Sequence, residues 1–522
     1  MEDKTDSILD IAKRRGFFWQ NSLIHGAMAG FYDYAHLGCL LKNKWQSLWR
    51  DYFLGLDDNF YEISVCHIMP EHVFKASGHL ASFVDPVVRC RKCGNTERAD
   101  HIIEDSLKES FEGASLEKMT EIIKEHNIRC PKCKGPLEET GILNMMFPIN
   151  VGTGEEVRKG YLSPETAQGA YINFKLEFEC LRRKLPMGLA IVGKAYRNEI
   201  SPRNVLIRMR EFTQAELQIF FDPDSITEHP KFHEVEDYPI RVFPAVNRKS
   251  GRIDEIPAKD VVKALGMPKF YVYHMAKIQQ FYIEKLKLPR ELFRFRQLTD
   301  EEKAFYNKYH WDIELNLESL GGFKEVAGLH YRTDHDLLGH QSVSGESQEI
   351  NIEGKKFIPH VLELSFGVDR NVYALFELAL VEEKIVDGRH QETPSGQKGE
   401  QRSVLKFPRL VSPQDAGIFP LVNKDGLPEK AREIQALLKE HGFVVFYDQS
   451  GSIGRRYRRI DEIGVAAGIT IDYDTLKHED VTLRDRDSMK QVRVKIVELP
   501  EVLKRFLNGE DLEKLGSRLS SD

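Results

Sequence analysis

Residues 207–221 read IRMREFTQAELQIFF and alternate between two kinds of side chain. Because successive side chains of a β-strand point to opposite faces, the stretch predicts a strand with one polar and one largely apolar face. Solvated faces usually carry Lys, Glu and Thr, whereas this polar face carries Arg, Gln and Glu, which favours a binding face. The polar face contains Arg208, Arg210, Phe212, Gln214, Glu216, Gln218 and Phe220.

The preceding residues 189–200, LAIVGKAYRNEI, predict a partner strand that carries Arg197 and Glu199 on one face. The connection between the two strands adds Arg203. Arginine binds phosphate oxygens through a planar, bidentate fork, so this junction predicts a polyanion site. Residues 188–194, GLAIVGK, nearly match a phosphate-binding P-loop, but an apolar strand stands in place of the loop and Ala195 replaces Ser or Thr.

Residues 357–380, FIPHVLELSFGVDRNVYALFELAL, predict a strand followed by a helix. Glu363 and Ser365 share one face of that strand, and Arg370 falls in the first turn of the helix. A cation there runs against the helix dipole. An anionic ligand would explain the placement, and pairing with Asp369 is the alternative.

Three segments resemble the signature motifs of class II aminoacyl-tRNA synthetases. Residues 196–199, YRNE, with 208–212, RMREF, resemble motif 2, and residues 366–370, FGVDR, resemble motif 3. Residues 30–34, GFYDY, resemble the motif 1 region, which forms the dimer interface in that class. The resemblance implies an α+β fold with an antiparallel catalytic sheet flanked by helices, and a homodimer.

Within the class, several stretches are similar to glycyl-tRNA synthetases: SGH at 77–79, RADH at 98–101, PETAQG at 164–169 and IGRRY at 453–457. This resemblance implies a ligase that activates glycine with ATP to glycyl-adenylate and transfers it to the 3′ end of tRNA(Gly). One rival is a class II synthetase for threonine, serine or proline. The other is a non-catalytic paralogue that binds nucleic acid, although such paralogues typically lose the arginines found here.

The resemblance also implies roles for individual residues. It assigns catalysis to Arg197, Glu199 and Arg370. The expected ATP-binding residues are Arg197, Asn198, Glu199, Ile207, Arg208, Met209, Arg210, Glu211, Phe212, Glu325, Val326, Gly367, Val368, Asp369 and Arg370. The expected glycine-binding residues are Arg98, Glu165, Phe212, Thr213, Gln214, Ala215, Glu216, Glu363, Leu364, Ser365, Phe366 and Gly367. Glu325 and Glu363 resemble the carboxylates that lie near Mg²⁺.

The chain departs from the family pattern at a few positions around the expected glycine pocket. Ser163 stands where the family usually has Arg, and Leu364 stands where it usually has Pro. His330 and Tyr331 are also unusual in their stretch. The arginines expected to bind ATP are all present.

Two CxxC pairs stand in a chain with seven cysteines. Each pair is followed closely by glycine, and four thiolates at this spacing suit a structural Zn²⁺. A redox CxxC is the alternative, although two matching pairs favour zinc. The expected zinc ligands are Cys90, Cys93, Cys130 and Cys133.

Residues 450–459, SGSIGRRYRR, are the densest basic segment of a chain whose net charge is −7. Clustered arginines around a tyrosine suit RNA binding, while a solvated helix face balanced by nearby acids is the alternative. The resemblance of this region to an anticodon-binding domain favours RNA. The expected tRNA-binding residues are Arg455, Arg456, Arg458 and Arg459.

The length of 522 residues predicts several domains. We expect the N-terminal part of the catalytic domain over residues 1–88, a zinc-knuckle insertion over 89–143, the catalytic core over 144–402 and an anticodon-binding domain over 403–522. Residues 387–402 read as a loop or linker. The sequence contains no apolar run of about 18 residues, so it predicts no membrane span. It contains no recognisable signal peptide, and we therefore expect a cytoplasmic protein.

Overall fold

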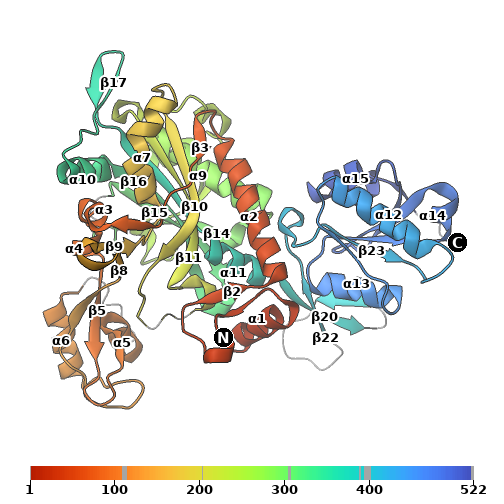
Figure 1. Ribbon diagram of the computed structural model, residues 1–522, viewed down its shortest axis with the longest axis horizontal. Helices are drawn as coiled ribbons and strands as arrows, with labels where there is room; N and C mark the ends of the chain where they lie inside the picture. The colour runs from red at the N-terminus through yellow and green to blue at the C-terminus, as the bar shows by residue number, and fades with distance from the viewer. Residues whose placement is uncertain are drawn as a thin grey trace.

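The computed structural model describes residues 2–107, 114–200, 202, 204–303, 307–386, 389–392 and 401–518. A large, mostly antiparallel sheet forms the centre of the molecule (Figure 1). Only its β12–β14 and β10–β3 pairs are parallel. In spatial order its strands are β13 (Asp254–Pro257), β12 (Pro239–Phe243), β14 (Phe293–Gln297), β15 (Tyr309–Leu317), β16 (Gly322–Thr333), β19 (His360–Gly367), β11 (Glu211–Phe221), β10 (Met187–Tyr196) and β3 (Phe60–Glu62).

Helices cover both faces of this sheet. The odd-numbered apolar residues of β11 pack into the main core together with side chains of α2 (His36–Leu54), α9 (Lys269–Gln280) and α11 (Val368–Ala379). On the other face, α7 (Ala167–Cys180) packs on the outer half of the sheet, where Phe174 stacks on Phe220. The α+β fold predicted from the sequence is confirmed, and so is the alternation along β11.

The strand predicted over residues 207–221 is shorter than expected. Residues 205–207 form a 3₁₀ turn, and β11 begins at Glu211. Asn204 and Val205 have positive φ, so the chain turns instead of extending the ladder. The two arginine segments still face each other past the end of the ladder, because the Arg197 N–H donates to the Arg210 carbonyl at 2.9 Å. Arg203 lies outside the described residues.

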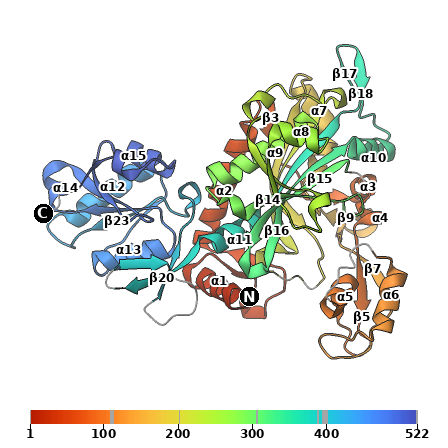
Figure 2. The same ribbon diagram turned by 180° about the vertical axis from the view of Figure 1, so that it is seen from behind.

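The cysteine-bearing insertion is a small unit with its own core. Its sheet contains β5 (Val84–Arg89), β6 (Thr96–Arg98) and β7 (Gly141–Asn144), packed against α5 (Ala99–Leu107) and α6 (Leu116–Glu125). The sheet therefore starts a few residues before the boundary expected at residue 89. Figures 1 and 2 show this unit at the opposite side of the central sheet from the C-terminal domain.

The C-terminal domain is the α/β unit that the alternation of strands and helices predicts. Its strands, in spatial order, are β24 (Val445–Tyr447), β23 (Ala416–Pro420), β25 (Ala467–Ile471), β26 (Asp480–Asp485), β27 (Gln491–Lys495) and β28 (Ser517–Arg518). Its helices are α12 (Leu427–Glu440), α13 (Ile453–Glu462), α14 (Tyr473–His478) and α15 (Leu499–Leu507).

A small sheet joins the two large domains. It contains β20 (Leu380–Val386), β21 (Arg389–Glu392) and β22 (Gln401–Leu405), so part of the loop expected over residues 387–402 is strand, and β22 crosses the expected boundary at 402. Residues 387, 388 and 393–400 of that loop lie outside the described residues.

The remaining elements surround the central sheet. They are α1 (Glu2–Arg15), β1 (Phe18–Gln20), β2 (Tyr32–Tyr34), β4 (Ile68–Pro70), α3 (Glu71–Ala76), α4 (His79–Ser82), β8 (Phe147–Val151), β9 (Arg158–Leu162), α8 (Ala258–Ala264), α10 (His335–Ser344), β17 (Ile350–Ile352) and β18 (Lys355–Phe357). No helix among the described residues is long and apolar enough to span a membrane.

Candidate functional site

A pocket of about 360 Å³ opens on the polar face of the central sheet. Strands β11, β15, β16 and β19 supply half of its lining residues. Sixteen of the residues expected to bind ATP or glycine line it: Glu165, Arg197, Glu199, Ile207, Arg208, Met209, Phe212, Thr213, Gln214, Glu216, Glu325, Glu363, Ser365, Gly367, Asp369 and Arg370.

Nine of the expected residues lie outside this lining. The side chains of Ala215, Val326, Leu364, Phe366 and Val368 are buried in the main core. The side chain of Leu364, which stands where the family usually has proline, therefore does not line the pocket. Arg98 pairs with Asp85 and Asp100 in the insertion, and Glu211 pairs with Lys194. The other two are Asn198 and Arg210.

Three guanidinium groups gather at one end of the pocket. Arg197 donates to the Pro164 carbonyl at 3.0 Å and lies 5.2 Å from the centre of the Phe212 ring. Arg208 lies 3.5 Å from a carboxylate oxygen of Glu199. This end of the pocket combines positive charge with an aromatic face, which suits the phosphates and base of a nucleotide.

Arg370 completes the cationic end from the first turn of α11. Its partner is Glu325 of β16, at 2.8 Å, and its Nε donates to the Ile207 carbonyl at 3.0 Å. Asp369, the alternative partner, instead accepts from Lys42 and from the Tyr34 hydroxyl, both at 2.7 Å. Glu325 of β16 thus holds the Arg370 guanidinium toward the pocket, although Arg370 lies at the start of a helix.

The other end of the pocket is a cluster of buried carboxylates around one guanidinium. Arg332, whose side chain is 2% exposed, donates to Glu363 at 2.7 Å and to Asp336 at 2.9 Å. A third carboxylate, that of Glu165, lies 3.4 Å from it. Since the carboxylates outnumber the guanidinium, this end can accept a small cation such as an ammonium group.

Glu216 is the fourth carboxylate of this cluster, and no guanidinium group of the described residues contacts it. It accepts from Thr166 at 2.6 Å, from Ser365 at 2.6 Å and from Gln214 at 2.8 Å. Burial, reinforced by the charges of Glu363 and Glu165, raises the pKa of Glu216 to about 7.

Glu363 shows the opposite shift. Burial raises its pKa, but the Arg332 guanidinium and His330 outweigh that effect and hold the pKa at about 2. A substrate ammonium beside Glu216 would supply the positive charge that Glu363 already receives from Arg332.

Sequence reasoning missed Arg332 and Asp336, which organise the carboxylate cluster. The signal was present in residues 328–336, GLHYRTDHD, where Gly328, His330 and Arg332 alternate onto one strand face. His330 lies 3.4 Å from Glu363, and its ring meets the His310 ring edge to face at 4.2 Å. The departure at His330 thus lines the pocket directly.

Ser163 is fully buried beneath this end of the pocket. Its hydroxyl donates to the Glu165 carbonyl at 2.6 Å, so it supports the turn that presents Glu165.

The two carboxylates expected near Mg²⁺ lie at different ends of the pocket. The β16–β19 register pairs His330 with Glu363 and Ala327 with Phe366. Glu325 therefore lies five residues along β16 from His330, the cross-strand partner of Glu363. Four or five residues of strand correspond to roughly 13–17 Å. Glu325 belongs to the cationic end and Glu363 to the carboxylate cluster.

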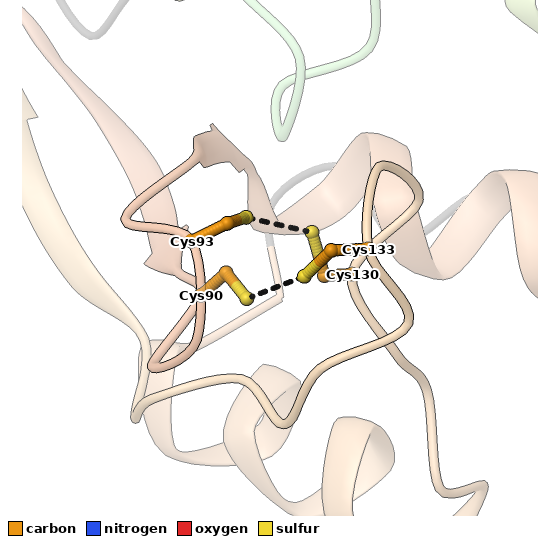
Figure 3. Close-up of side chains that lie close together, drawn as sticks. All are labelled: Cys90, Cys93, Cys130 and Cys133. Carbon is orange, nitrogen blue, oxygen red and sulfur yellow. Dashed lines mark hydrogen bonds between the residues drawn. The ribbon is translucent and has the colours of Figure 1, made fainter.

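The four predicted cysteine ligands converge in the insertion (Figure 3). Their sulfur atoms all lie within 4.8 Å of one another, with Cys90–Cys133 at 3.5 Å and Cys93–Cys130 at 3.7 Å. Tetrahedral zinc with Zn–S bonds of about 2.3 Å requires S–S separations of about 3.8 Å. Hydrogen bonding from the Cys93 backbone lowers the pKa of Cys90 to about 6, whereas hydrogen bonding with the Cys93 side chain raises the pKa of Cys133 to about 12, so the first thiolate of the cluster forms at Cys90. The residues fit a zinc ion.

The four arginines of the basic segment lie on or beside α13, but they are not equivalent. Arg456 is 2% exposed and donates to the backbone carbonyls of Pro420 and Gly451. Arg459 pairs with Asp448. Arg455 and Arg458 are exposed and form no ion pair with any described residue.

Two protein families and several curated proteins match this chain. The family "tRNA synthetase class II core domain (G, H, P, S and T)" matches residues 153–378, and the family "Anticodon binding domain" matches residues 415–506. Similar curated proteins are the glycine–tRNA ligases of Pyrococcus furiosus, 39% identical over 97% of this chain and 100% of the relative, and of Aeropyrum pernix, 37% identical over 99% of each. That of Methanococcus maripaludis is 35% identical over 96% of this chain and 99% of the relative.

Proposed function

The chain belongs to the glycine–tRNA ligase family, and from that premise we propose which residues carry each step of the ligase reaction. The enzyme joins glycine to tRNA by forming glycyl-adenylate from ATP and transferring the glycyl group to the tRNA 3′ end. The observation that supports the assignment is the division of one pocket into a cationic end and a carboxylate end.

ATP occupies the cationic end in this proposal. Arg197 contacts the α-phosphate and the attacking glycine carboxylate, and Arg370 contacts the γ-phosphate. Phe212 stacks on the adenine. Displacement at phosphorus needs alignment and charge stabilisation more than a protein nucleophile, which suits guanidinium groups that strand and helix ends hold in place.

Magnesium accompanies ATP in class II synthetases and neutralises phosphate charge during the transfer. Glu325 is the carboxylate placed to hold it, since it lies beside Arg370 at the cationic end and its side chain is about half exposed.

Glycine occupies the carboxylate end. Its ammonium group lies among Glu165, Glu216 and Glu363, and its carboxylate points toward Arg197. Ser365 and the residues around it fill the space that a larger side chain would need, so that steric exclusion supports selection of glycine.

A pair of substitutions tests the division of the pocket. Arg370→Gln should raise the KM for ATP in ATP–pyrophosphate exchange with little change in the KM for glycine, because it removes a phosphate contact. Glu363→Gln should raise the KM for glycine more than that for ATP. We expect losses of roughly 10²–10³-fold in kcat/KM for each. Equal effects of both variants on both KM values would contradict the assignment.

The C-terminal domain binds tRNA through the exposed arginines of α13, and the Cys₄ centre of the insertion holds zinc in a structural role. Four thiolates leave no open coordination position, so the zinc takes no part in the chemistry. The enzyme acts in the cytoplasm.

A homodimer is proposed on the exposed apolar side chains of the motif 1 region. Ile24 is 90% exposed, and Leu23 and Met28 beside it are also exposed. An apolar loop tip of this kind is typical of a protein interface.

A further inference from the structure

One lysine connects helix α2 with the two elements that begin at the cationic end of the pocket. Lys42 lies in α2, and its side chain is 11% exposed. Its ammonium group donates to the Asp369 carboxylate of α11 at 2.7 Å and to the Thr213 hydroxyl of β11 at 2.8 Å. The same ammonium lies 4.4 Å from the centre of the Tyr34 ring. Lys42 therefore contacts both the start of β11 and the first turn of α11.

Asp369 is a buried carboxylate that depends on these donors. Its side chain is 2% exposed, and it also accepts hydrogen bonds from the Tyr34 hydroxyl and from the Thr213 N–H. Burial raises the pKa of Asp369, but the charge and the hydrogen bond of Lys42 outweigh that effect and hold the pKa below its usual range. Asp369 is therefore ionised, and Lys42 neutralises it.

The position of Asp369 makes its charge important for ATP. Asp369 lines the pocket directly before Arg370, at the end proposed to bind the phosphates. In a buried site, charges interact strongly because little water screens them. A carboxylate without its cation at this point would repel phosphate oxygens and would attract the nearby guanidinium groups.

Two other carboxylates at this end of the pocket are neutralised in a different way. Glu199 lies 3.5 Å from Arg208, and Glu325 lies 2.8 Å from Arg370. Both of these arginines line the pocket, whereas Lys42 is not among the described residues that line it. Asp369 is thus neutralised from outside the pocket, by a cation that takes no arginine away from the phosphates.

We propose that Lys42 is a positioning residue for glycine activation: by neutralising Asp369 from α2, it keeps the cationic end of the pocket available to ATP. This inference rests on the proposed function of the pocket. Lys42 touches no substrate and acts through the residues that it contacts. Through the Thr213 hydroxyl it also fixes the start of β11, next to Phe212, the residue proposed to stack on adenine.

A double-mutant cycle between Lys42 and Asp369 tests the inference. Kinetic constants for ATP and glycine are measured by ATP–pyrophosphate exchange for Lys42→Met, Asp369→Asn and the double variant. Lys44→Met is the matched control, because Lys44 lies on the same helix and pairs with Asp415, which does not line the pocket. Thermal unfolding of every protein shows whether it is folded.

Lys42→Met should lower kcat/KM for ATP by roughly 10²-fold in the unmodified enzyme but by less than about 3-fold in the Asp369→Asn background, where the charge to be neutralised is absent. The KM for glycine should change by less than about 3-fold, because the carboxylate end of the pocket is unaltered. Lys44→Met should match the unmodified enzyme in both substrates.

Equal losses for ATP and glycine in Lys42→Met would overturn the inference, since they would indicate general damage to the fold. The same loss for ATP in both backgrounds would also overturn it. If Lys42→Met alone does not fold, the double variant is compared with Asp369→Asn: near-equal kcat/KM for ATP supports the inference, and a difference of roughly 10²-fold overturns it. An unchanged KM for ATP in Arg370→Gln would instead contradict the proposed function of the cationic end.

Discussion

Glu216 links stability and substrate binding within a single buried side chain. Its pKa of about 7 means that the folded protein binds a proton at this carboxyl more tightly than the unfolded chain does. Its contribution to stability is therefore complete below the unfolded pKa of about 4.5 and is lost as pH rises through about 7. The ionised form, to which we assign the attraction of the glycine ammonium, is the form that destabilises the fold.

Glu216→Gln should accordingly raise the unfolding temperature more at pH 8.5 than at pH 6, because the carboxylate that it removes costs about 2 kcal/mol of stability at pH 6 and about 3 kcal/mol at pH 8.5. The same variant should lose most of its glycine-dependent exchange. In the unmodified enzyme the KM for glycine should fall as pH rises from 6 to 8. Thermal unfolding at the two pH values gives the test, and a variant with the same stabilisation at both would contradict the shift in pKa.

Prediction from the sequence was most successful for residues in regular strands. Alternation alone placed Gln214 and Glu216 on the pocket face, because the pleat fixes the direction of each side chain. It could not find the partners of those residues. Arg332 contacts Glu165 and Glu363, which lie far from it in the sequence, and such contacts depend on the order of strands in the sheet, which the sequence pattern leaves open.

Helix α13 shows how an element-level pattern can combine two functions. Its arginines form one basic segment in the sequence, yet the burial of Arg456 against the carbonyls of Pro420 and Gly451 gives that residue a structural part. Successive residues of a helix point in different directions, some to the core and some to solvent. Arginines that are neighbours in the sequence can therefore be buried or exposed.

We therefore expect two variants of α13 to behave differently. Arg455→Glu/Arg458→Glu should weaken tRNA charging and leave glycine activation and the unfolding temperature nearly unchanged. Arg456→Ala should lower the stability of the C-terminal domain by about 1–3 kcal/mol, because it leaves buried carbonyls without their donors. Aminoacylation, exchange and thermal unfolding of both proteins are the measurements. Equal destabilisation by both variants would show that the exposed arginines are structural too.

At the scale of the whole molecule, the motif 1 loop connects the expected dimer interface with the catalytic site. Arg210, beside the motif 2 strand, donates to the Ala29 carbonyl at 2.8 Å, and its N–H donates to the Gly30 carbonyl at 2.8 Å. These two hydrogen bonds connect the loop at residues 22–30 with the arginine segments proposed to bind ATP.

Ile24→Asp places a charge on the most exposed apolar side chain of this loop. We expect the variant to be monomeric in light scattering and to lose exchange activity at least 10-fold, while Val246→Asp, a matched change at another exposed apolar residue, keeps both properties. A monomeric variant with full activity would separate dimerisation from catalysis, and a dimeric one would place the interface elsewhere.

The overall architecture was predicted well because resemblance in motifs 1, 2 and 3 extends to the fold of their class. The ends of elements were predicted less well. The short 3₁₀ turn at residues 205–207 and the strand β22 across the expected domain boundary depend on contacts between domains and on backbone conformations with positive φ, which hydrophobic periodicity does not encode.

ATP–pyrophosphate exchange with each amino acid supplied alone tests the central claim, that the carboxylate end of the pocket selects glycine for activation. The account predicts exchange with glycine and with no other amino acid, with kcat/KM for glycine lower by roughly 10²–10³-fold in Glu363→Gln while ATP binding persists. Exchange supported by another amino acid would show that the assignment of the carboxylate cluster is wrong, and a folded protein with no exchange at all would contradict the catalytic role of the pocket.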